Sequence, residues 1–195
     1  MLTKDQIIVP NGIKRIEKFQ YARSKALDVI IPDGIEIIDD YAFANSKDLI
    51  SVTIPDSVAV LGTGIFSGCK RLREVKIGSR VSLIAPFAFA DCKRLMNIAM
   101  PEKLEYIYDF AFTGCKRLVS VKLNEGLKSI GESAFSSCDK LKEIDIPSSV
   151  QKIEPYAFSC CMGLESVRLK SDKILIHKDA FVFSPNAKTY VLNSP

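Results

Sequence analysis

The chain has 195 residues, of which 47% are apolar and 26% charged, and its formal net charge is +4 at neutral pH. These values are ordinary for a soluble protein with a substantial core, and so mild a basic balance does not indicate nucleic-acid binding. No apolar run is long enough to span a membrane. Residues 1–6 lack the charged-then-apolar pattern of a signal peptide.

One pattern recurs every 23 residues along nearly the whole chain. Each unit begins at an apolar anchor that proline often follows, and a Phe stands twelve residues later. The anchors are Ile31, Ile54, Ile77, Met100, Leu123, Ile146 and Leu169, and the Phe residues are Phe43, Phe66, Phe89, Phe112, Phe135, Phe158 and Phe181. Such self-similarity predicts stacked units with one continuous core, that is, a solenoid. We expect a single domain over residues 1–195, with repeats starting near 9, 31, 54, 77, 100, 123, 146 and 169.

The first element of each unit is predicted to be a short strand that ends at the anchor. Residues 95–100 end in alternating apolar and polar residues, with Ile98 and Met100 on one face, and Pro101 then ends the strand. Equivalent strands are expected at 52–54, 75–77, 121–123, 144–146 and 167–169, with a final one at 190–192. Stacked in register, they form a parallel sheet with about 4.8 Å between neighbours.

Two further elements follow each strand. An apolar pair, such as Leu104 and Ile107, predicts a second row of side chains that face inward. The Ala-Phe-x-x-Cys segment, as at 111–115, favours a single helical or 3₁₀ turn that presses its Phe into the core. The expected fold is therefore an α/β repeat solenoid. The first unit is irregular, because Tyr21 replaces the Phe.

Residues 72–77 (LREVKI) and 141–147 (LKEIDIP), together with the Ala-Phe-x-x-Cys segment, resemble the leucine-rich repeats of the BspA-like (Treponema pallidum) type. The resemblance covers roughly residues 7–192. It implies a right-handed superhelix of about eight units with the parallel strands on its concave face. Members of that family are often bacterial or protist surface proteins that bind host proteins or other cells, and the family defines no active-site residues. The resemblance thus implies an extracellular or cell-surface location, although a cytoplasmic one stays open without a signal peptide.

The strand residues that point away from the core are the candidate partner-binding surface, for a protein or a glycan. They are of mixed charge and include no large aromatic side chain, which indicates a broad polar contact. The candidates on this concave face are Glu74, Lys76, Asn97, Ser120, Lys122, Glu143, Asp145 and Arg168. An idle, solvated face is the alternative interpretation. Tyr108, outside the strands, is expected to be exposed and could be a contact residue.

Three basic doublets occupy one position of consecutive repeats and should line up as a stripe. This basic stripe consists of Lys70, Arg71, Lys93, Arg94, Lys116 and Arg117. Repulsion between rungs about 5 Å apart amounts to roughly 1 kcal/mol in water and is screened by salt, so the stripe needs no ligand to exist. A solvated face is the favoured interpretation, and weak, salt-sensitive binding of heparin-like polyanions is the functional alternative.

Five cysteines share one repeat position: Cys69, Cys92, Cys115, Cys138 and Cys161. Their stacked Cβ vectors run parallel, which is poor geometry for a disulfide, and no Cys-x-x-Cys or accompanying His indicates a metal site. We expect them to be small buried side chains beside the Phe ladder. Cys160 lies outside this ladder, and we expect it to be the exposed thiol.

The sequence offers no catalytic constellation and no cofactor or metal motif. His177 is the only histidine, and it lacks partners at the spacing of a catalytic triad, so we expect an ordinary surface residue. The leading hypothesis is a non-catalytic binding module. The alternative is a structural spacer or assembly unit that self-associates through bare solenoid ends.

Overall fold

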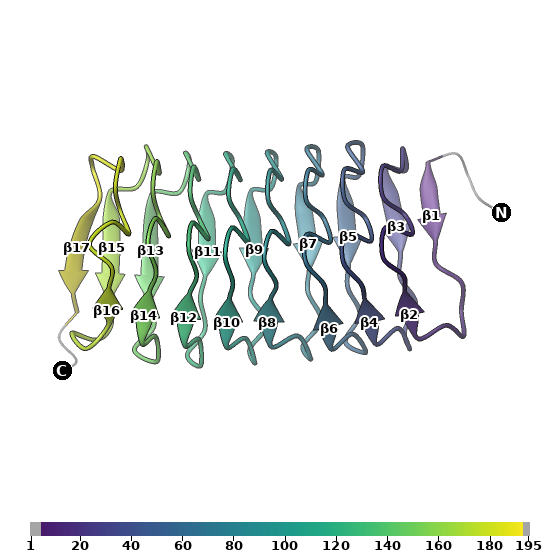
Figure 1. The fold of residues 1–195 in the computed structure, drawn as a ribbon, viewed down its shortest axis with the longest axis horizontal. Helices are drawn as coiled ribbons and strands as arrows, with labels where there is room; N and C mark the ends of the chain where they lie inside the picture. The colour runs from purple at the N-terminus through teal and green to yellow at the C-terminus, as the bar shows by residue number, and fades with distance from the viewer. Residues whose placement is uncertain (1–4, 193–195) are drawn as a thin grey trace.

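The computed structural model describes residues 5–192, which form an elongated stack of coils (Figure 1). Each coil up to β16 contributes one longer and one shorter strand, on opposite sides of the stack, and a further longer strand follows β16. The longer strands are β1 (Gln6–Ile8), β3 (Asp28–Ile30), β5 (Ser51–Thr53), β7 (Glu74–Lys76), β9 (Asn97–Ala99), β11 (Ser120–Lys122), β13 (Glu143–Ile146), β15 (Ser166–Leu169) and β17 (Lys188–Val191). The shorter ones are β2 (Arg15–Ile16), β4 (Ile37–Ile38), β6 (Val60–Leu61), β8 (Leu83–Ile84), β10 (Tyr106–Ile107), β12 (Ser129–Ile130), β14 (Lys152–Ile153) and β16 (Leu175–Ile176).

The longer strands make up what we call the long-strand face, and the shorter ones the short-strand face. The strands predicted at the anchors are confirmed, although several begin one residue earlier, as at β5, and the last, β17, begins two residues earlier. The predicted second inward-facing row is itself a parallel ladder of two-residue strands, which periodicity did not reveal. In β10, for example, Ile107 is buried while Tyr106 is half-buried.

All strand pairs are parallel and differ by one repeat, but the ladders are not continuous. The long-strand face divides into three hydrogen-bonded sheets, β1-β3-β5-β7, β9-β11 and β13-β15-β17. The short-strand face divides into two, β2-β4-β6 and β8-β10-β12-β14-β16. The coils nevertheless stay stacked across these interruptions, since the core runs through them without a gap in its buried residues.

A ladder of stacked aromatic rings runs through the core. It begins at Tyr21 and continues through the repeated Phe residues to Phe181, with ring centroids 5.1–5.7 Å apart in successive pairs. The six rings from Phe43 to Phe158 are fully buried. Parallel stacking adds about 0.5–1.5 kcal/mol per pair to the burial of these side chains, so the ladder is a major source of stability.

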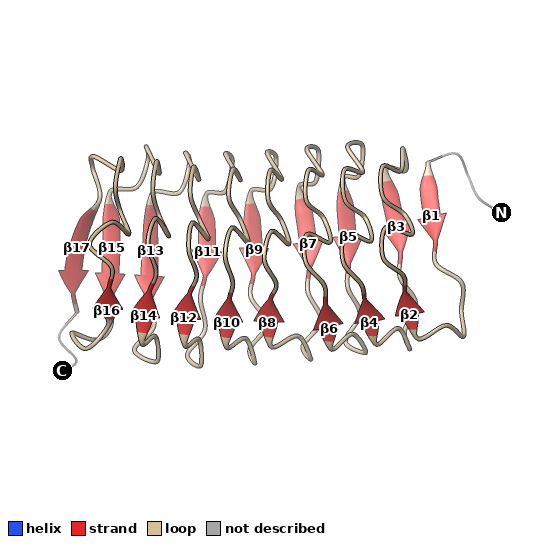
Figure 2. Cartoon of the chain, in the orientation of Figure 1, coloured by secondary structure: helices blue, strands red, loops and turns tan. Residues whose placement is uncertain are grey.

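The segments that carry this ladder form one edge of the stack, which we call the turn corner: residues 17–24, 39–46, 62–69, 85–92, 108–115, 131–138, 154–161 and 177–184. The expected helical or 3₁₀ turn is wrong, because residues 5–192 contain no helix of any kind (Figure 2). The predicted solenoid of parallel strands with a 23-residue repeat is confirmed, whereas its helical component is absent from residues 5–192, which are all-β rather than α/β.

Successive tight turns replace the helical turn. In one coil, the amide of Ala44 bonds to the carbonyl of Tyr41 within its own turn, while the amide of Phe43 bonds to the carbonyl of Ile65 in the next coil. In every segment of the turn corner except the last, two residues adopt left-handed backbone angles, as Tyr41 (φ 56°) and Asn45 (φ 59°) do here. A helix cannot accommodate that alternation, because left-handed residues interrupt its hydrogen-bond pattern.

The five cysteines of the ladder are buried and unbridged, as expected. Each Sγ donates to the backbone carbonyl of the Phe in the preceding coil, at 3.1–3.5 Å. At either end of the row the same bond is made by a serine: Ser46 Oγ to the Tyr21 carbonyl (3.1 Å) and Ser184 Oγ to the Phe158 carbonyl (2.7 Å). The repeat position therefore selects a small side chain that can donate a hydrogen bond. Burial raises the pKa of the Cys69 and Cys161 thiols to about 12, so they stay protonated.

Candidate functional site

The eight candidate residues of the long-strand face all point outward. Seven are exposed and Arg168 is half-buried, because they alternate along each strand with buried apolar residues. In β13, for example, Glu143 and Asp145 face outward while Ile144 and Ile146 enter the core. The predicted orientation of this face is confirmed. Its role in binding stays a prediction.

Five of these eight residues come together around one groove: Ser120, Lys122, Glu143, Asp145 and Arg168. The groove has a volume of about 290 Å³ and lies where β11 and β13 belong to separate sheets. The other three candidates, Glu74, Lys76 and Asn97, belong to β7 and β9 and do not line it. The interruption of the hydrogen-bonded ladder between β11 and β13 thus coincides with the groove.

Arg168 is the centre of the charged cluster at the groove. Its Nη1 donates to Glu143 Oε2 at 2.7 Å, and its Nε donates to Asp145 Oδ1 in the neighbouring coil. The hydrogen bond with Glu143 and then that with Asp145 raise the pKa of the Arg168 guanidinium above its ordinary value. The guanidinium, which is charged at any ordinary pH, lies across the two carboxylates in an arrangement that suits its planar fork of donors.

Lys170 also lines the groove and was not among the sequence candidates. Lys170 Nζ donates to Glu125 Oε1 at 3.0 Å, although the two residues are 45 positions apart and belong to coils that are not neighbours. This bond is the main cause that lowers the pKa of the Glu125 carboxyl. The sequence did hold a signal for this region, because Asn124 and Lys170 stand directly after anchors, where several other repeats have proline.

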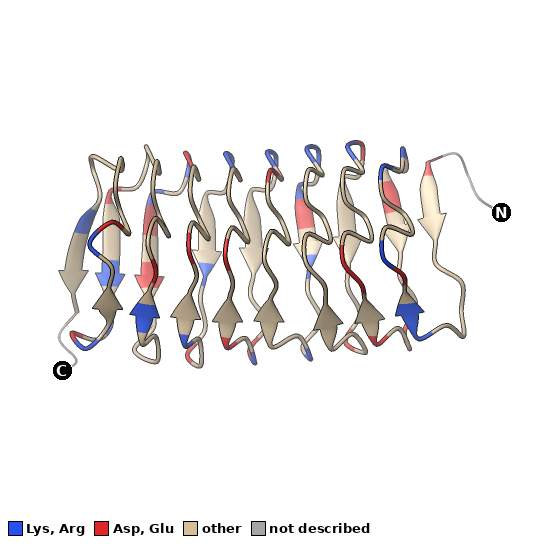
Figure 3. Ribbon diagram, in the orientation of Figure 1, with Lys and Arg blue, Asp and Glu red and all other residues tan. Residues whose placement is uncertain are grey.

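The basic stripe lies along the loop tips that follow the turn corner, as Figure 3 shows at the upper edge of the stack. All six of its residues are exposed, and a role for this stripe in binding stays a prediction. Half of them have acidic partners: Arg71 with Asp48 at 3.3 Å, Lys93 with Asp91 at 3.9 Å, and Lys116 with Asp139 at 3.9 Å. Exposed pairs such as these are worth about 0–1 kcal/mol, so the stripe stays strongly positive.

The remaining candidates lie outside both surfaces. Tyr108 is exposed, as expected, and its ring stacks on Tyr106 with centroids 5.9 Å apart. His177 is exposed and accepts a hydrogen bond from the amide of Asp179. Cys160 is half-buried and is the one cysteine that is not fully buried. Among residues 5–192 no group of three His, Cys, Asp or Glu side chains could hold a metal ion. That part of the chain also has no helix long and apolar enough to cross a membrane.

A family model described as the BspA type leucine-rich repeat region matches the chain in six copies, over residues 3–100 and 82–194. No curated protein matches the chain.

Solved structures of leucine-rich repeat proteins are similar to this fold. A leucine-rich repeat protein from Bacteroides ovatus is 24% identical with a TM-score of 0.78, over 96% of this chain and 55% of its own. A leucine-rich cell surface protein from Faecalibacterium prausnitzii is 25% identical with a TM-score of 0.62, over 97% of this chain and 60% of its own. The T. pallidum leucine-rich repeat protein is 26% identical with a TM-score of 0.50, over 86% of this chain and 60% of its own. The chain thus spans little more than half the length of these proteins.

Proposed function

The chain belongs to the BspA-type leucine-rich repeat family, and on that premise we propose that it is a non-catalytic binding module that recognises a protein or glycan partner through its long-strand face. The observation that carries this proposal is the groove between β11 and β13, where charged side chains from several coils converge. A solenoid offers an extended surface of this kind rather than an enclosed pocket, which suits recognition of a large partner.

We also propose a place at the surface of a bacterial or protist cell, with adhesion to host proteins or other cells as the biological role. Support comes from the family and from the relative in F. prausnitzii that is described as a cell surface protein. The mixed charges of the face suit a partner that is itself polar, because complementary charges determine register and specificity more than raw affinity.

Binding of the fluorescently labelled chain to cultured epithelial cells tests this function. We expect saturable binding that falls at least tenfold when Glu143 and Arg168 are exchanged by Glu143→Arg and Arg168→Glu, because the potential around the groove is rearranged while the net charge is kept. A matched variant on the short-strand face, Lys128→Glu with Glu105→Lys, should bind as the unaltered chain does. Equal loss in both variants, or no saturable binding, would contradict the proposal.

A second candidate function is assembly through the ends of the solenoid. It is favoured by β17, whose four residues are all exposed, including Tyr190 and Val191 at 48% each. An exposed strand edge of this kind is a template for pairing with another chain. Sedimentation velocity over a range of concentrations should then detect oligomers that Tyr190→Glu abolishes. A monomer at every concentration would refute assembly and leave the binding proposal untouched.

A further inference from the structure

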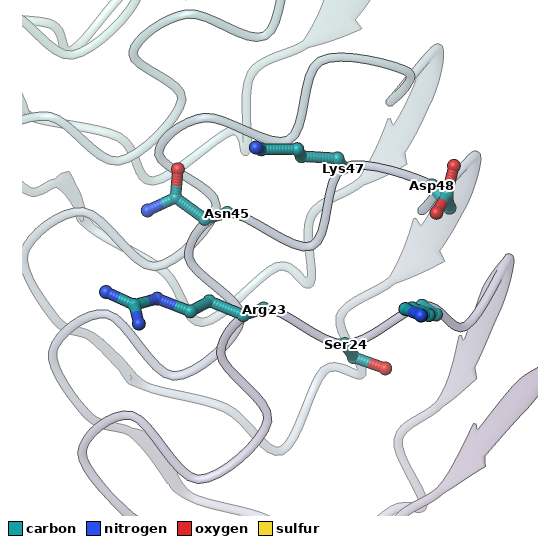
Figure 4. A pocket seen from close by; sticks show the side chains of 6 residues that line it. Arg23, Ser24, Asn45, Lys47 and Asp48 are labelled. Atoms are coloured by element: carbon teal, nitrogen blue, oxygen red, sulfur yellow. The ribbon is translucent and has the colours of Figure 1, made fainter.

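The positive surface at the loop tips extends beyond the basic stripe toward the N-terminal coils, where it borders a pocket of about 470 Å³. Arg23, Ser24 and Lys25 line it from one coil, and Asn45, Lys47 and Asp48 line it from the next. In Figure 4, the side chains of Arg23, Asn45 and Lys47 extend to the same side of the ribbon. We call this site the Arg23 pocket.

The cations of the Arg23 pocket differ from those of the doublets in their partners. Each doublet has one residue paired with a carboxylate, whereas Arg23, Lys25 and Lys47 form no ion pair with any described residue. The one acid in the pocket is Asp48, and its Oδ1 accepts a hydrogen bond from Nη1 of Arg71 in the following coil at 3.3 Å. Three like charges in two adjacent coils repel one another, and a bound anion relieves that repulsion.

Asn45 and Ser24 add neutral polar groups to the pocket. The Asn45 side chain is exposed, and the Ser24 hydroxyl accepts a hydrogen bond from the amide of Ala26 at 3.1 Å, which leaves its proton available to a ligand. Guanidinium, ammonium, amide and hydroxyl donors together are the groups that bind sulfate or carboxylate oxygens.

An apolar surface adjoins the pocket on the other side of Arg23 and Asn45. It is a second hollow of about 470 Å³, lined also by Phe19, Tyr41 and two alanines. The rings of Phe19 and Tyr41 are stacked, with centroids 5.3 Å apart and planes within 10°, and Phe19 is 54% exposed. A ligand that fills both hollows must carry anionic groups and an apolar surface side by side. Sugar rings that bear sulfate or carboxylate groups have that character, and an inorganic polyanion does not.

We propose that the Arg23 pocket anchors a sulfated or carboxylated glycan, whose ring packs against Phe19 and Tyr41 and whose chain continues along the basic stripe. In each further coil, the basic residue without an acidic partner then contacts the glycan. These residues are Lys70, Arg94 and Arg117. Five coils at about 4.8 Å each give a track roughly 19 Å long between the first and last cation, which a short oligosaccharide covers. This surface is separate from the long-strand face, so either proposal can fail without the other.

The test is the affinity of the full chain for a heparin hexasaccharide, measured by titration calorimetry at low and at physiological salt. We expect the double variant Arg23→Asn, Lys47→Ser to lose at least tenfold in affinity, as the loss of charge-assisted hydrogen bonds implies. Asn suits position 23 because Asn45 holds the same left-handed backbone one coil later. The matched control Lys142→Ser, Lys173→Ser removes the same charge elsewhere and should lose less than twofold. Equal losses in the two variants would overturn the pocket as the anchor.

Two further arms separate a glycan from any other polyanion and the pocket from the stripe. Phe19→Ser should weaken hexasaccharide binding and leave inorganic polyphosphate binding unchanged. Serine suits this position because Ser133 has the same left-handed backbone at the equivalent position of a later coil. Replacing Lys93, Arg94, Lys116 and Arg117 by Ser should lower the affinity less than the pocket variant does. Glycan recognition would be refuted if the hexasaccharide and the polyphosphate bound equally and Phe19→Ser changed neither affinity. The whole track would be refuted if every variant were retained on a heparin column as the unaltered protein is.

Discussion

The turn corner and the long-strand face are built from the same repeats but differ in continuity. In the corner, intercoil hydrogen bonds, stacked rings and the Cys/Ser ladder run from the first coil to the last. On the face, the strands fall into three sheets and the outward side chains change from coil to coil. The corner thus carries the stability that stacking requires, and this leaves the face able to vary without loss of the fold.

High pH should cause the largest loss of stability in the turn corner. Five buried thiols have raised pKa values, because burial disfavours the thiolate. Below the unfolded-state pKa near 9 the thiols are protonated in both states, and their contribution to stability is fully present. Between that pH and the higher folded-state pKa values only the unfolded chain releases the thiol protons, so the contribution is lost as the pH rises. In that pH range each thiol lowers the free energy of unfolding by about 1.4 kcal/mol per pH unit. Urea unfolding between pH 8 and 11 measures the loss, and a flat profile would contradict it.

Removal of one ring from the aromatic ladder should have the next largest effect. Phe112 is fully buried between Phe89 and Phe135, so Phe112→Ala creates a cavity and removes two stacked contacts. We expect a loss of about 3–5 kcal/mol in the free energy of unfolding by urea. On the face, Asn97→Ala should change it by no more than about 0.5 kcal/mol. Comparable losses at the two positions would erase the distinction between corner and face.

The Cys/Ser ladder allows a sharper test of what the corner requires. Cys115→Ser should cost less than Cys115→Ala, because Ser46 and Ser184 already donate to the equivalent carbonyls while Ala leaves the Phe89 carbonyl without this donor. The difference should be about 1 kcal/mol in unfolding free energy. Cys115→Ser should also reduce the alkaline loss by one thiol. If Ala is the better tolerated residue, the hydrogen bond is irrelevant and only volume counts.

Arg168→Ala on the face should also have a small effect. The ion pairs of Arg168 with Glu143 and Asp145 are solvent-exposed, so we expect less than about 1 kcal/mol in unfolding free energy. A double-mutant cycle with Asp145→Ala, measured at low and high salt, should give a coupling energy that salt diminishes. A coupling as large as the loss for Phe112→Ala would assign a structural role to the cluster.

By itself, the sequence determined the period, the inward residues and the two charged surfaces. A strict 23-residue repeat leaves each position the same neighbours in every coil, so Ile98, Phe112 and Cys115 are buried wherever the coils stack. The orientation of Glu143 and Asp145 followed in the same way, from alternation along a strand.

Only the tertiary structure decided how neighbouring coils meet. The left-handed residues of the turn corner, such as Tyr41, arise because alternate amides bond to the next coil, a demand that local propensity does not express. The groove at β11 and β13, the bond between Lys170 and Glu125 and the unpaired cations of the Arg23 pocket likewise depend on register and rotamer across coils. Periodicity determines which residues lie side by side, whereas the balance of hydrogen bonds and charges between them determines which ones bind each other.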